Sequence, residues 1–316
     1  MRILVTGGRG FLGKALVREL VDLGHDVAVL DNGFRGRGEA TADVELFDED
    51  VRDAEAVRRA VRGRDVVAHL AAVQGTSNFY EIPHTVLDVN LRGVLNVAEA
   101  CAAEGVRRLF FSSSSECYGF PAVFPTPEDE PLQVPNPLNP RWSYGGSKIA
   151  GELVVVNYAR RCGYEFSIAR YHNVYGPAMG WDHVIPQFIR RLELGAEFTV
   201  QGDGEQTRAF CYLDDAVAGT VEALLRKGAA EQIFNIGNPD AETTINSLIE
   251  VLSRISGKSI HPIHVPFDGA GTPRRVPDIT LARAVLGFDP KVSFEEGLRR
   301  TYAWYADTLR VEAAAT

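Results

Sequence analysis

Apolar residues in the first part of the chain form short continuous runs separated by segments with helical spacing. Residues 2–6 and 26–30 are apolar runs of strand length, and residues 11–23 between them carry apolar side chains at helical intervals. Runs without polar alternation are typical of strands that are covered on both faces, as in a parallel sheet. The pattern therefore predicts a β-α-β unit at the start of the chain.

The same alternation continues to about residue 175 and predicts an α/β fold. We expect a Rossmann-type, doubly wound parallel sheet, because strands that alternate with helices pack into one sheet covered on both faces. A proline-rich stretch at 119–141 interrupts the pattern, and such long loops usually carry function. The remaining predicted elements are strands at 65–70, 108–111 and 165–170, and helices at 54–62, 86–105 and around 144–148.

The rhythm of the sequence changes near residue 175, where glycines, prolines and shorter elements appear. We expect residues 1–175 to form the sheet domain and residues 176–316 to form mostly a smaller lobe. Segments near 210–240 are expected to return to the main sheet, with a late strand at 234–237.

Composition and charge narrow the range of partners. The 316 residues are 45% hydrophobic and 24% charged, and the net charge of −9 disfavours nucleic acid and anionic membranes. We see neither a signal peptide nor an apolar run of about 18 residues, so we expect a cytoplasmic protein without a membrane span. The cysteines show no metal-ligand spacing, so we expect no metal and four free thiols: Cys101, Cys117, Cys162 and Cys211.

A glycine-rich turn joins the first predicted strand to the helix that follows. Thr6–Gly13 fits both G-x-x-G-x-x-G from Gly7 and G-x-G-x-x-G from Gly8. Between a strand and a helix, such glycines let the backbone approach a pyrophosphate, which then faces the helix N-terminus. The expected contacts of this dinucleotide site are Gly7, Gly10, Phe11, Leu12 and Gly13.

Asp31 ends the second predicted strand and indicates which dinucleotide binds. A carboxylate there accepts hydrogen bonds from a ribose 2′-hydroxyl and repels a 2′-phosphate, which favours NAD over NADP. Arg35 and Arg37 lie nearby and keep a phosphate ligand open as the alternative. The other cofactor residues expected in this region are Asn32 and, where the adenine docks, Asp50 and Val51.

Tyr144 and Lys148 form the candidate catalytic pair. Residues four apart on a helix share a face, and an ammonium beside a phenol lowers the pKa of the phenol from about 10. A tyrosine with a lowered pKa is a usable base near neutral pH. Together with a dinucleotide site, the pair predicts oxidation of a hydroxyl group by a nicotinamide cofactor.

Ordered motifs over nearly the whole chain resemble the extended short-chain dehydrogenase/reductase family, within it the NAD-dependent nucleotide-sugar epimerases, dehydratases and decarboxylases. The resemblance implies NAD as cofactor and a nucleotide-diphosphate sugar as substrate. It also implies a homodimer that pairs the helix near 88–104 with the helix near 143–160. Besides the motifs above, it rests on segments 69–72, 112–119, 170–177, 202–208 and 274–278.

The resemblance also implies roles for single residues. Tyr144 removes the proton of a sugar hydroxyl, usually at C4, Lys148 holds the nicotinamide ribose and lowers the pKa of Tyr144, and Ser114 hydrogen-bonds the same oxygen. Ser113 is the alternative to Ser114. Further implied cofactor contacts are Leu70, Ala71, Ala72 and His172. Implied substrate contacts are Gln74, Thr76, Ser115, Asn173, His183 (where relatives commonly have asparagine), Val184, Arg208 and Arg274, with Arg275 as the alternative to Arg274.

Glu116 distinguishes the reactions within the family. A carboxylate near C5 can remove the proton that a 4-ketone has made acidic, so Glu116 is a candidate second acid/base. The alternative is that Glu116 pairs with an arginine.

We expect an epimerase first and a 4,6-dehydratase or a decarboxylase as the alternatives. A net-reducing dehydrogenase and a silent NAD-binding scaffold are further rivals, and the intact set of Ser114, Tyr144 and Lys148 argues against the scaffold. The segments 74–79 and 170–177 resemble the GDP-mannose 3,5-epimerases more than the UDP-galactose epimerases. They favour a GDP-sugar slightly over a UDP-sugar.

Overall fold

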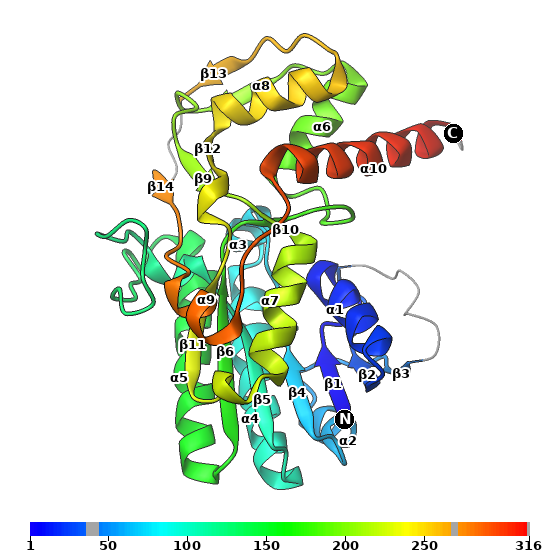
Figure 1. Cartoon of the computed structure of the whole chain (residues 1–316), viewed down its shortest axis with the longest axis vertical. Helices are drawn as coiled ribbons and strands as arrows, with labels where there is room; N and C mark the ends of the chain where they lie inside the picture. Colours follow the sequence, from blue (N-terminus) through cyan, green and yellow to red (C-terminus); the bar gives the residue numbers. More distant parts are fainter. Residues whose placement is uncertain (36–43, 267–270, 315–316) are drawn as a thin grey trace.

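A parallel sheet forms the centre of the computed structural model, which describes residues 1–35, 44–266 and 271–314 (Figure 1). Within these residues the sheet has seven strands in the order β11-β6-β5-β4-β1-β2-β3, and every neighbouring pair is parallel. This order confirms the predicted doubly wound fold. The strands are β1 (Arg2–Thr6), β2 (Asp26–Leu30), β3 (Glu45–Phe47), β4 (Val66–His69), β5 (Arg108–Ser114), β6 (Glu165–Tyr171) and β11 (Gln232–Ile236).

Helices cover both faces of the sheet because alternate strand residues point to opposite sides. Ile3 and Val5 of β1 pack into a core with one set of helices, and Leu4 packs into a second core with the other set. The first set is α1 (Phe11–Asp22), α7 (Leu213–Leu225) and α9 (Thr280–Leu286). The second set is α2 (Ala54–Val61), α4 (Pro83–Glu104) and α5 (Ser143–Cys162).

The remaining elements form a lobe beyond the carboxyl ends of the strands, in the upper part of Figure 1. Its helices pack around a separate apolar core that includes Phe188, Leu248 and Tyr305. The expected division of the chain into a sheet domain and a smaller lobe near residue 175 stays a proposal. The lobe contains α6 (Val184–Leu194), α8 (Ile245–Ser256), α10 (Phe294–Ala314), β7 (Val174–Tyr175), β8 (Thr199–Gln201), β9 (Thr207–Ala209), β10 (Cys211–Tyr212), β12 (Glu242–Thr244), β13 (Ile263–Val265) and β14 (Arg274–Arg275).

Two boundaries differ by three residues from those expected. Strand β5 continues to Ser114, because Ser112, Ser113 and Ser114 keep pairing with residues of β6. The expected end at residue 111 followed the last apolar side chain, whereas a strand is held by its backbone hydrogen bonds. Helix α4 begins at Pro83, three residues before the expected start, because proline is well suited to the first helical turn.

The outer surface of α4 and α5 carries exposed leucines. Leu153 of α5 is 61% exposed, and Leu87 and Leu95 of α4 are 38% and 37% exposed. An apolar helical surface of this kind suits the expected homodimer, which stays a prediction. None of the helices in the described part of the chain has the length and apolar character needed to cross a membrane.

Candidate active site

A cleft of about 1170 Å³ lies between the carboxyl ends of the strands and the lobe. It exceeds the ~300–1,000 Å³ of a usual small-molecule site, as a site for a dinucleotide and a second nucleotide should. Three expected site residues, Asp50, His172 and Arg274, are not among its lining residues. The expected residues that do line it are Gly7, Gly10, Phe11, Leu12, Gly13, Asp31, Asn32, Val51, Leu70, Ala71, Ala72, Gln74, Thr76, Ser114, Ser115, Glu116, Tyr144, Lys148, Asn173, His183, Val184 and Arg208.

The glycine turn forms the floor of one end of the cleft. Gly7 has a φ of +73°, a backbone conformation that favours glycine. A Cβ at position 13 would lie 2.1 Å from the carbonyl oxygen of Gly7, so only glycine fits there. No side chain caps the N-terminus of α1 at Gly10, and its first amides are available to a pyrophosphate. The turn therefore fits a dinucleotide such as NAD.

Replacing Gly13 tests this turn. We expect Gly13→Ala to lower the free energy of unfolding by about 1–3 kcal/mol, because the new methyl group is forced against backbone atoms. NAD binding should weaken at least about tenfold, because the turn must shift for the methyl to fit. Gly228→Ala is the matched control, since its Cβ would meet Val285 at 3.8 Å. Equal melting temperatures and equal NAD titrations for the two variants would contradict this assignment.

Asp31 lies at the end of β2, where a ribose hydroxyl would dock. Its carboxylate accepts hydrogen bonds from the backbone N–H groups of Arg9 (2.9 Å) and Gly33 (2.8 Å), which fix its orientation. Arg35 lies within electrostatic range of Asp182 and Tyr144 across the cleft. Arg37, the other arginine considered for a phosphate, lies outside the described residues.

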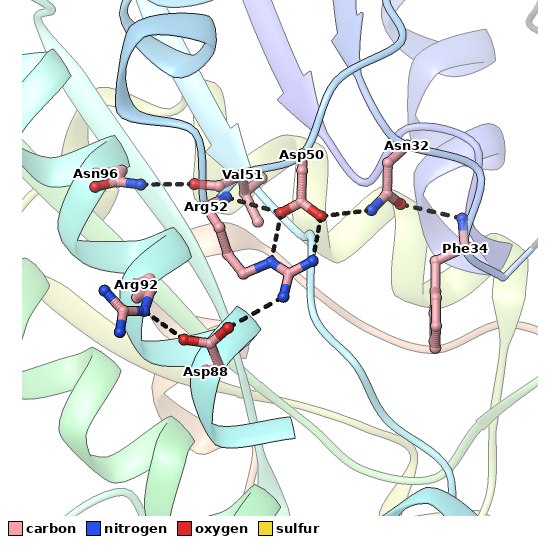
Figure 2. Close-up of polar contacts among 8 residues, drawn as sticks. All are labelled: Asn32, Phe34, Asp50, Val51, Arg52, Asp88, Arg92 and Asn96. Atoms are coloured by element: carbon pink, nitrogen blue, oxygen red, sulfur yellow. Dashed lines mark hydrogen bonds and ion pairs between the residues drawn. The ribbon is translucent and has the colours of Figure 1, made fainter. Parts of the chain in front are cut away.

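Asp50 does not line the cleft, and its carboxylate is held by Arg52, which sequence reasoning missed (Figure 2). Arg52 bonds both carboxylate oxygens of Asp50, with Nη2 at 2.8 Å and Nε at 3.0 Å, and these bonds lower the pKa of Asp50. Arg52 also reaches Asp88 of α4 at 3.0 Å, and Asn32 donates to Asp50 at 2.9 Å. Val51 therefore lines the cleft where we expect the adenine to dock, whereas Asp50 does not.

Tyr144 and Lys148 lie on one face of α5, opposite the end of β5. The Lys148 ammonium donates to the backbone oxygen of Ser112 at 2.7 Å, and its Nζ lies 5.6 Å from the centroid of the Tyr144 ring. Burial lowers the pKa of Lys148 to about 8. Burial also raises the pKa of Tyr144, although a hydrogen bond with Ser114 and the charge of Arg35 act in the opposite direction. In the protein alone, burial therefore outweighs the lowering that we expected Lys148 to produce, and the ammonium faces the ring and a carbonyl oxygen.

Glu116 lies among arginines at the substrate side of the cleft. Its carboxylate accepts hydrogen bonds from Arg275 at 2.7 Å and from Arg141 at 3.3 Å. Burial acts to raise the pKa of Glu116, but Arg275, Arg141 and Arg208 outweigh it and lower the pKa to about 2. An ionised carboxylate held in this way is a weak base, so the geometry favours the arginine-paired alternative over a second acid/base.

The depressed pKa of Glu116 predicts a pH-dependent contribution to stability. The folded pKa of about 2 lies below the usual value of about 4.3, so the contribution is complete above pH ~4.3 and is lost as the pH falls toward 2. We expect the difference in unfolding free energy between wild type and Glu116→Gln to shrink by about 1 kcal/mol between pH 6 and pH 3.5. Urea unfolding at both pH values measures it. A difference that stays constant would mean that folding does not lower the pKa of Glu116.

The structure corrects the placement of two further residues. His172 is fully buried, and its Nε2 lies 3.1 Å from the side-chain oxygen of Asn235, beneath the cleft; Tyr171 lines the cleft instead. Arg274 points outward and pairs with Glu242 at 2.7 Å, whereas its neighbour Arg275 lines the cleft. Successive residues of an extended segment point in opposite directions, which separates each pair. Of the two arginines left open, Arg275 is therefore the one at the site.

The glycine turn, Asp31 and the Tyr144-Lys148 pair together match a known sequence family. Residues 3–237 match the NAD-dependent epimerase/dehydratase family. The chain belongs to this family. The predicted family and NAD as the cofactor are therefore confirmed, and this epimerase/dehydratase is an enzyme.

Similar proteins and solved structures are decarboxylases and epimerases that act on nucleotide sugars. The UDP-N-acetyl-alpha-D-glucosaminuronate decarboxylase of Bacillus cytotoxicus is 35% identical over 97% of this chain and 98% of its own length. The UDP-glucose 4-epimerase of Thermotoga maritima, solved with UDP-glucose, has a TM-score of 0.90 and 34% identity over 98% of this chain and 100% of that one. The UDP-glucuronic acid 4-epimerase of Bacillus cereus, solved with UDP-glucuronic acid and NAD, has a TM-score of 0.87 and 29% identity over 98% and 100%.

Proposed function

We propose that this epimerase/dehydratase is an NAD-dependent UDP-sugar epimerase that acts through transient oxidation of the sugar at C4. The observation that carries the proposal is the convergence of Ser114, Tyr144 and Lys148 in the cleft that also contains the glycine turn. When bound, NAD supplies a hydride acceptor that can return the hydride to either face of the resulting ketone.

The residues of the chain perform the proton chemistry. Tyr144 takes the proton of the C4 hydroxyl, and the Ser114 hydroxyl, which lies close enough to act on the pKa of Tyr144, hydrogen-bonds the same sugar oxygen. Lys148 is fixed by the Ser112 carbonyl and places a positive charge beside the base. Because burial raises the pKa of Tyr144, the positive charge of Lys148 is needed to favour its phenolate form.

The relatives favour uridine over guanosine as the nucleotide. Each of the three proteins described above has a name or a bound ligand with a uridine diphosphate. They do not support the slight preference for a GDP-sugar that segments 74–79 and 170–177 suggested. Asn173, His183, Val184 and Arg208 line the cleft and are our proposed contacts to the nucleotide diphosphate.

The arginines around Glu116 favour one second candidate, a UDP-uronate decarboxylase. Arg141, Arg208 and Arg275 act on the single carboxylate of Glu116, which leaves positive charge in excess. An additional carboxylate on the sugar would balance it. A ketone at C4 makes a C6 carboxylate a β-keto acid. When its C5–C6 bond breaks, carbon dioxide leaves, the electron pair passes to the C4 oxygen, and C5 then takes a proton.

Mass-resolved chromatography separates the candidates. The purified protein would be incubated with UDP-glucose, UDP-galactose and UDP-glucuronate, and with GDP-mannose as the comparison. A product of unchanged mass and new retention supports the epimerase, whereas loss of carbon dioxide supports the second candidate. Loss of water from a UDP-sugar, or turnover of GDP-mannose alone, would contradict both.

A further inference from the structure

A third residue extends the catalytic face of α5. Tyr144, Lys148 and Glu152 are spaced four apart, so they lie in one row along the helix. The row faces the last three residues of β5. Lys148 donates to the Ser112 carbonyl at 2.7 Å, Ser113 donates to Glu152 at 2.5 Å, and the Ser114 hydroxyl lies close enough to Tyr144 to act on its pKa. Each of the last three residues of β5 therefore interacts with one of these three residues of α5.

Arg170 holds Glu152 in place from the neighbouring strand. The register of β5 and β6 places Arg170 directly beside Ser113. Its guanidinium contacts both oxygens of Glu152, with Nε at 2.9 Å and Nη2 at 2.7 Å, and the two side chains are only 4% and 5% exposed. Burial alone would lower the pKa of Arg170, but the hydrogen bonds to Glu152 outweigh it and raise the pKa. Arg170 is thus charged in the interior, where it forms a buried ion pair with Glu152.

The same guanidinium reaches the segments that form the substrate side of the cleft. Its Nη1 donates to the Tyr118 hydroxyl at 3.0 Å and to the backbone oxygen of Glu128 at 2.7 Å. Tyr118 follows Glu116 by two residues and donates to Asn235 of β11 at 2.8 Å. The register of β6 and β11 pairs Asn235 with Arg170. The pair of Glu152 and Arg170 therefore connects α5, the strands β5, β6 and β11, and the loop after β5. These contacts lie directly beneath the reacting residues.

We propose that Glu152 and Arg170 are positioning residues that fix Lys148 and Ser114 relative to Tyr144. A buried ion pair is weak evidence for stability alone, because the loss of solvation offsets the attraction. Here Glu152 lies on the helix that carries Tyr144 and Lys148, and it accepts a hydrogen bond from Ser113 beside Ser114. Arg170 donates to Tyr118, which follows Glu116 by two residues. The pair therefore holds the elements of the site together and determines its geometry. Small errors in such geometry reduce catalysis strongly while leaving binding largely intact.

The test compares this buried ion pair with a partly buried one at the other end of β5 and β6. In Glu152→Gln, kcat for the UDP-sugar that wild type converts should fall about 10- to 100-fold, while KM changes less than about threefold and bound NAD is retained. The control is Glu165→Gln, because Glu165 pairs with the fully buried Arg108 at the opposite end of β5 and β6. The control should lower the melting temperature without lowering kcat. A normal kcat in Glu152→Gln, or an equal loss in both variants, would overturn the proposal.

Two further measurements keep the test decisive. If Glu152→Gln fails to fold, Ser113→Ala is the second variant. It removes the hydrogen bond to Glu152 together with a 3.3 Å contact to the Cys117 thiol, and it should still lower kcat at least about threefold; an unchanged kcat overturns the proposal. The inference rests on the proposed function, so a measurement without turnover must separate a failure of the positioning role from a failure of the proposed function. Hydrogen exchange of the NAD-loaded protein is such a measurement. Without any substrate, exchange at residues 112–116 should be faster in Glu152→Gln and unchanged in Glu165→Gln. Unchanged exchange in both variants overturns the positioning role, whereas an inactive wild type counts only against the proposed function.

Discussion

Tyr144→Phe should reduce turnover of the UDP-sugar by about 100- to 10,000-fold, the usual contribution of a positioned acid or base. The change removes only the hydroxyl that takes the C4 proton, and the ring keeps its packing against Phe79, at a centroid distance of 5.1 Å. The glycine turn and Asp31 are untouched, so NAD should remain bound. Steady-state kinetics and the NAD content of the purified variant measure both effects.

The control for this variant lies on the same helix. Tyr158 of α5 points away from the cleft, and its hydroxyl donates to Glu99 at 3.1 Å on the surface. Tyr158→Phe should therefore keep wild-type turnover. Substantial turnover in Tyr144→Phe, with folding and NAD content preserved, would remove Tyr144 from the proposed chemistry.

Arg275→Gln should produce the second large effect. It removes the 2.7 Å hydrogen bond to Glu116 and leaves that carboxylate with Arg141 as its remaining bonded partner. Removing one partner of a buried charged pair costs about 3–5 kcal/mol. Part of this cost appears as lost stability of the protein and part as lost affinity for an anionic substrate. We expect kcat/KM for a UDP-uronate to fall at least about 100-fold, and kcat/KM for a neutral UDP-sugar to fall less.

The neighbouring residue gives a matched control. Arg274→Gln removes an equal charge one position away, but Arg274 contacts Glu242 and the ring of Phe124 outside the cleft. Its kinetics should stay within about threefold of wild type. If both variants behave alike on UDP-glucuronate and UDP-glucose, Arg275 has no special part in substrate recognition.

The sequence allowed the fold and most of the residues that line the cleft to be predicted, because these depend on local patterns. Apolar runs define buried strands, and the glycines at 7, 10 and 13 form a turn whose geometry follows from their spacing. The row of Tyr144 and Lys148 was readable from helical periodicity. Glu152 lies four residues after Lys148 and continues that row. The sequence alone does not indicate a role for this carboxylate, because its partner Arg170 is known only from the fold.

The missed features depend on contacts between distant parts of the chain. Glu116 meets Arg275 across 159 positions, and the direction of Arg275 rather than Arg274 follows from the path of a short strand in the lobe. The pKa of Tyr144 depends on how deeply the folded protein buries it, which the spacing to Lys148 does not reveal. Arg52 was likewise overlooked because its partner Asp88 lies on α4.

The most direct test of the central claim, transient oxidation at C4, uses UDP-glucose and UDP-glucuronate that carry deuterium at C4. The account predicts that whichever sugar reacts does so more slowly than its unlabelled form and that the deuterium is still at C4 in the product. This holds for the epimerase and for the second candidate, because in both the hydrogen leaves C4 and returns to it. Loss of the C4 deuterium to solvent, or turnover without any isotope effect and without reduced cofactor at any stage, would contradict the account.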